Sequence, residues 1–122
     1  GVKNPAIYHA ESGEFTKVGY TDNDFIMSSG QYVIINTYTG KKNVYLLDGV
    51  TQAEIENHKD NYGVIDWDRV IEKYGTVINE YLDEDGDFIQ LQDGTNTLTY
   101  SAEEGTNYLS VSVYYRISYL GV

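Results

Sequence analysis

The end of the chain carries the most regular pattern of apolar and polar positions. From residue 108 to residue 120, the odd positions are apolar, while three of the even positions are serine and one is Arg116. A period of two over this length predicts one long, half-buried antiparallel strand. We expect Val113 on its core face and Ser112 on its outer face. Val113→Asp should then unfold the domain, because an unpaired charge in a core costs several kcal/mol, whereas Ser112→Asp should be tolerated.

Other segments have the composition of shorter strands. Residues 31–39 are rich in β-branched and aromatic side chains, and the turn at residues 39–42 leads to a hairpin partner at residues 43–48, which ends at Asp48-Gly49. Glycine, asparagine or aspartate bounds further predicted strands at residues 6–10, 15–18, 25–27, 88–91 and 97–101. Strands of this length and spacing indicate an all-β, antiparallel β-sandwich.

Residues 51–75 interrupt the β pattern. Thr51 and Glu54 have the spacing of a capping box, which predicts that a short helix starts there. Residues 66–74 carry apolar side chains at helical spacing, and Gly75 stands where a left-handed helix cap is expected. The sequence therefore predicts a short helical insertion in the sandwich.

Composition and charge restrict the class of protein and its partners. A chain of 122 residues with 41% apolar residues has the size and hydrophobicity of one folded domain. Its formal net charge of -11 repels phosphates and anionic lipid headgroups, so neither nucleic acid nor a membrane surface is an expected partner. The sequence contains no cysteine, which excludes disulfides and thiolate metal sites.

A run of carboxylates occupies the region after residue 79. The spacing from Asp83 does not fit an EF-hand, since Phe88 and Gly94 stand where glycine and glutamate are required. A solvated loop is the favoured interpretation, and a calcium site of another geometry is the alternative. Between Glu80 and Glu104 there are eight carboxylates and no lysine or arginine, a composition suited to a basic partner.

Few residues offer enzyme chemistry. A pair of carboxylates would suit a glycosidase, but chance pairing is expected among so many surface acids. His9 and His58 are the only histidines, and no serine lies in a Gly-x-Ser-x-Gly elbow. We expect both histidines to be solvated. The chain is therefore predicted not to be an enzyme and to need no cofactor or metal.

The sequence contains 13 tyrosines, which raises the alternative of sugar binding, because aromatic faces stack on pyranose rings. Tyrosine is also a good strand residue, so a core or interface role is favoured for each of them. On the terminal strand, Tyr115 and Tyr119 are expected in the core and Tyr114 on the surface. The candidate interaction surface comprises Trp67, Tyr114, Asp83, Asp85 and Asp87.

Several short motifs occur in a recognisable order. They are Asn4-Pro5-x-Ile7, the segment from Val33 to Leu46, Leu91-x-x-Gly94-x-Asn96, Val111-x-Val113-x-Tyr115 and the ending Tyr119-Leu120-Gly121-Val122. Their order and the C-terminal ending resemble the C-terminal domain of siphophage distal tail proteins. The chain departs from that family at Asp93, where proline is usual, and in the length of the insertion at residues 51–75.

The resemblance implies a galectin-like β-sandwich on the outside of a ring of tail subunits at the tail tip or baseplate. In that family a separate N-terminal domain forms the ring, so residues 1–122 are expected to be the outer domain of a larger tail protein. Implied partners are other tail proteins and a receptor-binding protein. The implied location is the virion of a phage or prophage, after synthesis in the bacterial cytoplasm. The alternative function is a carbohydrate-binding module that recognises a bacterial cell-wall glycan.

Overall fold

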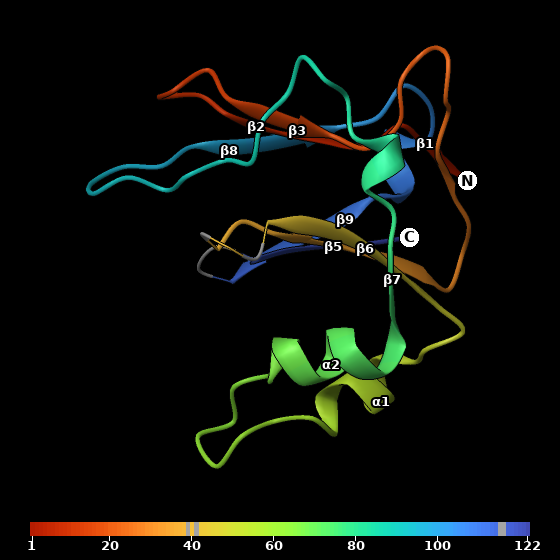
Figure 1. The fold of residues 1–122 in the computed structure, drawn as a ribbon, viewed down its shortest axis with the longest axis vertical. Helices are drawn as coiled ribbons and strands as arrows, with labels where there is room; N and C mark the ends of the chain where they lie inside the picture. Colours follow the sequence, from red (N-terminus) through yellow and green to blue (C-terminus); the bar gives the residue numbers. More distant parts are fainter. Residues whose placement is uncertain (39, 41, 115–116) are drawn as a thin grey trace.

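The fold has three layers in a computed structural model that describes residues 1–38, 40, 42–114 and 117–122. Figure 1 shows a three-stranded sheet at the top, a five-stranded sheet in the middle and two helices below it. All named strand pairs are antiparallel. The predicted all-β sandwich with a short helical insertion is therefore confirmed.

The smaller sheet forms the upper layer. Its order is β3-β2-β8, with β2 (Ala6–His9) between β3 (Phe15–Lys17) and β8 (Leu98–Ser101). A short ribbon of β1 (Val2–Lys3) and β4 (Ile26–Met27) lies beside it. The strands predicted at residues 6–10, 15–18, 25–27 and 97–101 are therefore present, each slightly shorter than predicted.

The larger sheet has the order β7-β6-β5-β10-β9. Its central hairpin joins β5 (Gln31–Asn36) to β6 (Asn43–Asp48), as predicted, and Gly49 follows at a φ of 72°. Thr39 and Lys41 of the predicted turn lie outside the described residues. The strands at the two edges are β7 (Gly75–Val77) and β9 (Ser110–Tyr114), and β10 (Ile117–Gly121) lies between β5 and β9.

The prediction of one long terminal strand is wrong, because the segment forms the β9–β10 hairpin. Tyr114 is opposite Ile117 and Val111 is opposite Leu120. Directly opposed residues share a face of the sheet, so the odd positions of β9 lie on the face of the even positions of β10. Val113 is therefore at a sheet edge with 42% exposure, and its predicted burial in the core is wrong.

Two helices form the lower layer. The predicted capping box exists at α1 (Gln52–Glu56), where the Glu54 amide donates to Thr51 Oγ1 over 3.1 Å. Asp66 caps α2 (Trp67–Tyr74) by accepting from the Arg69 amide over 3.1 Å. The expected left-handed cap at Gly75 is wrong, because Gly75 is extended and begins β7. A Cβ at this position would lie 2.7 Å from the Ile71 carbonyl oxygen, so close approach explains the glycine.

The central strands β5 and β10 of the five-stranded sheet are buried on both faces, and the sheet separates two apolar clusters. Val33 and Ile35 of β5 belong to the sandwich core between the sheets, whereas Ile34 belongs to a second core against the helices. This arrangement explains the continuous apolar run Val33-Ile34-Ile35, since a strand covered on both faces has no polar side. We call these clusters the sandwich core and the helix-side core.

Irregular segments connect the layers. The strand predicted at residues 88–91 does not form; Ile89 is nevertheless buried in the sandwich core from a loop. Two short 3-10 helices, η1 (Asn79–Tyr81) and η2 (Thr106–Tyr108), lead from one sheet to the other. Within the described part of the chain, no helix is long and apolar enough to cross a membrane.

Candidate functional site

An aromatic cluster forms where α2 meets the β9–β10 hairpin. The Trp67 ring centroid lies 5.1 Å from that of Tyr114 and 5.3 Å from that of Tyr119. Tyr32 of β5 stacks on Tyr119 with a centroid distance of 5.0 Å and an interplanar angle of 15°. Helix and hairpin thus unite two residues of the predicted interaction surface, Trp67 and Tyr114.

The members of this aromatic cluster differ in exposure. Trp67 and Tyr119 are each 8% exposed, whereas Tyr114 is 41% exposed. The indole ring is therefore the buried part of the cluster, and the phenol ring of Tyr114 is the part that solvent or a ligand reaches. Aromatic rings with one open side suit apolar contacts or the face of a sugar.

Polar atoms in the cluster are unevenly satisfied. The Tyr119 hydroxyl donates to Gln52 Oε1 over 3.1 Å. Burial, with the neighbouring Tyr32, raises the pKa of Tyr119 above the usual range for a phenol. Among the described residues, Trp67 Nε1 is the one buried side-chain nitrogen or oxygen that lacks a hydrogen-bond partner. An unpaired buried N–H costs free energy, so hydrogen bonding at this point is less complete than elsewhere among the described residues.

The acidic residues of the predicted surface lie elsewhere. Asp83 and Asp87 stand in a loop whose main chain follows the outer edge of β3: the Asp83 amide donates to the Lys17 carbonyl over 3.0 Å, and the Asp87 amide donates to the Phe15 carbonyl over 2.7 Å. Asp85 is exposed at the tip of this loop. The structure therefore groups the three aspartates on the upper layer and places the aromatic pair below the larger sheet.

The carboxylates in this loop do not converge. The Asp83 side chain accepts from the Asp85 amide over 2.9 Å, a contact within the loop. Across the described residues, no group of three or more histidine, aspartate or glutamate side chains is arranged to hold a metal ion. An open hollow lies beside the loop and is lined by Tyr20, Thr21, Asp22, Asp83, Glu84 and Asp85.

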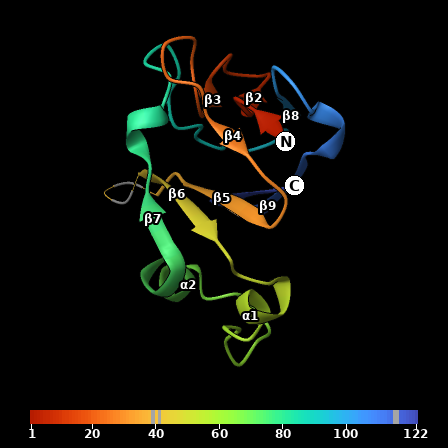
Figure 2. The same cartoon turned by 90° about the vertical axis from the view of Figure 1, so that its right-hand side faces the viewer.

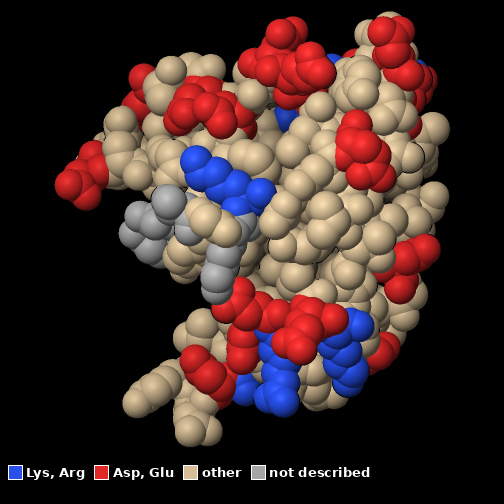
Figure 3. Space-filling view, in the orientation of Figure 1, with Lys and Arg blue, Asp and Glu red and all other residues tan. Residues whose placement is uncertain are grey.

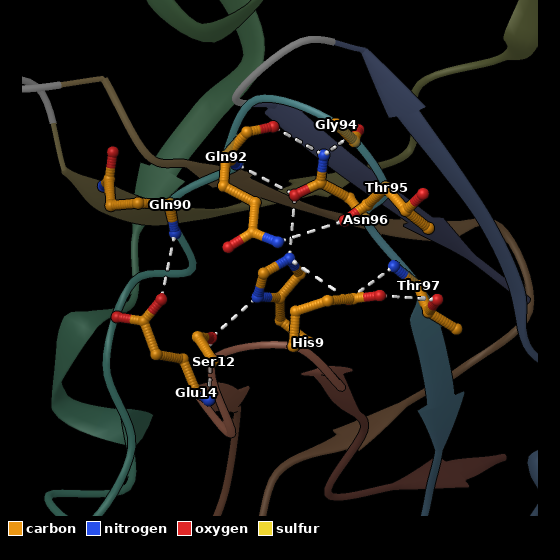
Figure 4. A network of polar contacts seen from close by, with 10 residues as sticks. His9, Ser12, Glu14, Gln90, Gln92, Gly94, Thr95, Asn96 and Thr97 are labelled. Atoms are coloured by element: carbon orange, nitrogen blue, oxygen red, sulfur yellow. Dashed lines mark hydrogen bonds and ion pairs between the residues drawn. The ribbon is translucent and has the colours of Figure 1, made fainter.

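Figure 4 shows a buried polar network around His9, which no local sequence signal indicated. His9 is 1% exposed, so its predicted solvation is wrong. Its Nε2 lies 2.8 Å from Asn96 Oδ1, and its Nδ1 lies 2.6 Å from Ser12 Oγ. Because Asn96 Nδ2 donates to the carbonyls of Gln92 and Gly94, its Oδ1 faces the ring. His9 Nε2 therefore carries the proton, and Nδ1 accepts from the Ser12 hydroxyl.

A carboxylate completes this network. Glu11 accepts from the amide and the hydroxyl of Thr97 at 2.7 and 2.8 Å, and these bonds lower the pKa of Glu11. Together the contacts fasten the loop before β8 to the end of β2. Both ring nitrogens of His9 are committed to this structural task.

The second histidine is half-buried, so it is less solvated than predicted. His58 Nδ1 lies 2.9 Å from the Glu54 carbonyl oxygen, at the end of α1. Its ring packs edge-on against Tyr74 with a centroid distance of 5.7 Å. His58 thereby joins the two helices.

Residues of the short motifs also have structural tasks. The buried Asn4 has a φ of 51°, accepts from the Phe25 amide over 2.8 Å and donates to Asp24 and Glu103. At the other end of the chain, a Cβ at Gly121 would lie 3.1 Å from the Tyr32 ring. A side chain at this position would therefore require the Tyr32 ring to shift by a few tenths of an ångström.

Comparison with known proteins identifies no relative: no family model, no curated protein and no solved structure matches this chain.

Proposed function

We propose that this chain is a non-enzymatic scaffold domain of a phage or prophage tail tip, which docks neighbouring tail or receptor-binding proteins. One observation carries the proposal: the residues on which the resemblance rests hold the framework together. Asn4 ties together three segments, Asn96 orders the loop before β8, and Gly121 admits the Tyr32 ring. Motif residues that hold the framework together identify a scaffold, and any binding would then depend on other residues at the surface.

The surface of the upper layer offers a charge pattern for docking. Figure 3 shows mainly carboxylates among the charged side chains of this layer, whereas lysine and arginine lie beside carboxylates over the helices and in a further patch between the two regions. Lys17 Nζ of β3 lies 2.9 Å from Glu103, and Lys3 Nζ of β1 lies 3.7 Å from Asp24, so both lysines have acidic partners. The remaining acids, including Asp83, favour a partner with a basic face.

Electron microscopy of the encoding phage, or of particles induced from its host, tests this proposal. An antibody raised against the 122-residue chain should place gold at the tail tip of purified particles. Antibody pre-absorbed with the chain is the control and should give no label. Absence of the protein from purified particles by mass spectrometry, together with absence of label, would contradict the proposal.

Glycan binding is the second candidate, and the half-exposed ring of Tyr114 against Trp67 favours it. Its test is an NMR titration of the labelled chain with cell-wall polysaccharide from the host. Shifts in the aromatic cluster that disappear in Tyr114→Ala, but persist in Tyr62→Ala, would support it. Tyr62 is a matched control because its ring is 92% exposed in a loop of the insertion. A titration without shifts removes this candidate.

A further inference from the structure

The two outer strands of the five-stranded sheet differ in length and exposure. β7 has three residues, whereas β9 has five, and all of these except Val111 are exposed. An outer strand presents unpaired N–H and C=O groups that another strand can use. β9 therefore offers the longer free edge.

Proteins usually protect such an edge by covering it or by placing charges or proline on it. The outer edge of β3 is covered, since the loop containing Asp83 and Asp87 bonds to it. The sequence of β9, Ser-Val-Ser-Val-Tyr, contains neither a charged residue nor proline. No charged residue occurs between Glu104 and Arg116. An uncharged edge of this length is unusual in a chain with a net charge of -11.

The sequence of β9 is complementary to itself. When two copies are aligned antiparallel about Ser112, Val111 of one copy is opposite Val113 of the other, and Ser112 is opposite its own counterpart. Opposed β-branched residues and opposed hydroxyl residues are both favourable cross-strand pairs. Such pairing has two-fold symmetry, uses the same edge in both copies and stops at a dimer.

The distribution of charge does not oppose the approach of two copies through their β9 edges. The acidic loop, residues 83–87, lies along β3. The chain reaches this loop from β7, and Leu82, just before it, forms an isolated β-bridge with Val18. Figure 2 shows β3 and β7 toward one side of the sandwich and β8 and β9 toward the other. Of the two acids that follow β8, Glu103 pairs with Lys17 and Glu104 with Lys3. Two copies joined through β9 thus keep their acidic loops apart.

We propose that β9 pairs antiparallel with β9 of a second copy, centred on Ser112, to give a continuous ten-stranded sheet. The inference is independent of the proposed tail function. Pairing over five residues buries less than the roughly 1,200 Å² of a standard interface, so the dissociation constant should lie in the high micromolar range.

Cysteine cross-linking tests the register directly, because the chain has no cysteine of its own. Ser112→Cys places two thiols opposite each other across the dimer axis. Ser110→Cys, also exposed on β9, places them four residues apart along the strand, about 13 Å, which is too far for a disulfide. Under mild oxidation, Ser112→Cys should form covalent dimers at least about five times faster than Ser110→Cys. Equal rates, or faster linkage of Ser110→Cys, would overturn the proposal.

Sedimentation of the unlinked chain provides the second test. Val113→Lys puts a charge on the proposed interface and should weaken the dimer at least about tenfold. Val77→Lys is the matched control: Val77 is 50% exposed on β7, the opposite edge of the same sheet, and its replacement should leave association unchanged. A wild-type chain that stays monomeric at about 1 mM, or equal effects of the two substitutions, would refute β9 pairing.

Discussion

At its centre, the five-stranded sheet is covered on both faces, but different kinds of structure cover them. Toward the smaller sheet, Val33, Val44 and Leu120 are fully buried in a core built mainly from aliphatic side chains. Toward the helices, Ile34 and Leu47 are equally buried, but they share their core with Trp67 and several tyrosines. One sheet thus acts as the common wall of two cores.

The two cores differ in how completely their polar groups are hydrogen-bonded and their rings are buried. The helix-side core contains the unpaired Trp67 N–H and extends to the half-exposed Tyr114. The sandwich core is closed by hydrogen-bonded polar residues, such as Asn4 and His9, at its ends. The sandwich core is therefore bordered by satisfied polar groups, whereas the helix-side core combines packing with an aromatic surface.

The largest effect should come from a charge in the sandwich core. Leu120→Asp should unfold the chain, because an unpaired buried carboxylate costs several kcal/mol against a net stability of about 5 to 15 kcal/mol. Val113→Asp, in the paired strand β9, should remain folded, since Val113 is 42% exposed. Far-UV circular dichroism with heating compares the two. Unfolding of both variants would contradict the hairpin.

A cavity in the helix-side core should have a smaller effect. Ile55 is fully buried between α1 and the sheet, so Ile55→Ala should lower the free energy of unfolding by about 2 to 5 kcal/mol. Glu56→Ala, which changes an exposed position in the same helix, is the control and should be nearly neutral. Urea titration measures both, and similar values would mean that α1 contributes little packing.

Tyr119→Phe should cost about 0.5 to 1.5 kcal/mol at neutral pH, since it removes the hydrogen bond to Gln52. Burial raises the pKa of Tyr119, so the folded chain keeps this proton at a pH where the unfolded chain, with a phenol pKa of about 10, releases it. Stability from this group is present below about pH 10 and is lost as the pH rises further. Tyr119→Phe should therefore flatten the alkaline loss of stability measured in urea, whereas Tyr62→Phe should not. Equal slopes would contradict the burial of this phenol.

The smallest effect is expected for Trp67→Phe. The substitution removes some apolar area but also removes an N–H that has no partner among the described residues. These contributions oppose each other, so the free energy of unfolding should change by less than about 1.5 kcal/mol. A loss above about 3 kcal/mol in urea unfolding would indicate that the indole N–H is satisfied in solution.

Local signals in the sequence predicted local structure well. The capping box at Thr51 and the hairpin of β5 and β6 both occur as predicted, because each depends on residues close together in the chain. The alternation at the C-terminus led to a wrong prediction of one strand, because it continues through a hairpin. In that hairpin, the odd positions of β9 lie on the same face as the even positions of β10. Tyr115, predicted in the core, lies outside the described residues.

Long-range contacts could not be predicted in the same way. Asn96 orders His9, and Trp67 packs against Tyr114. Nothing in a single sequence links the two members of either pair. The two parts of the predicted interaction surface likewise belong to different layers, because a position in the sequence does not reveal which sheet a loop follows. Only the side-chain type of Trp67 and Tyr114 marked them in advance.

The most direct test of the shared sheet follows urea unfolding with two signals from the same samples. Trp67, the only tryptophan, reports the helix-side core through its fluorescence, and far-UV circular dichroism reports the whole backbone. If the sheet is the common wall of both cores, the two transitions should have the same midpoint and slope. A fluorescence transition at clearly lower urea would show that the helices detach from a sandwich that stays folded, and would contradict the shared wall.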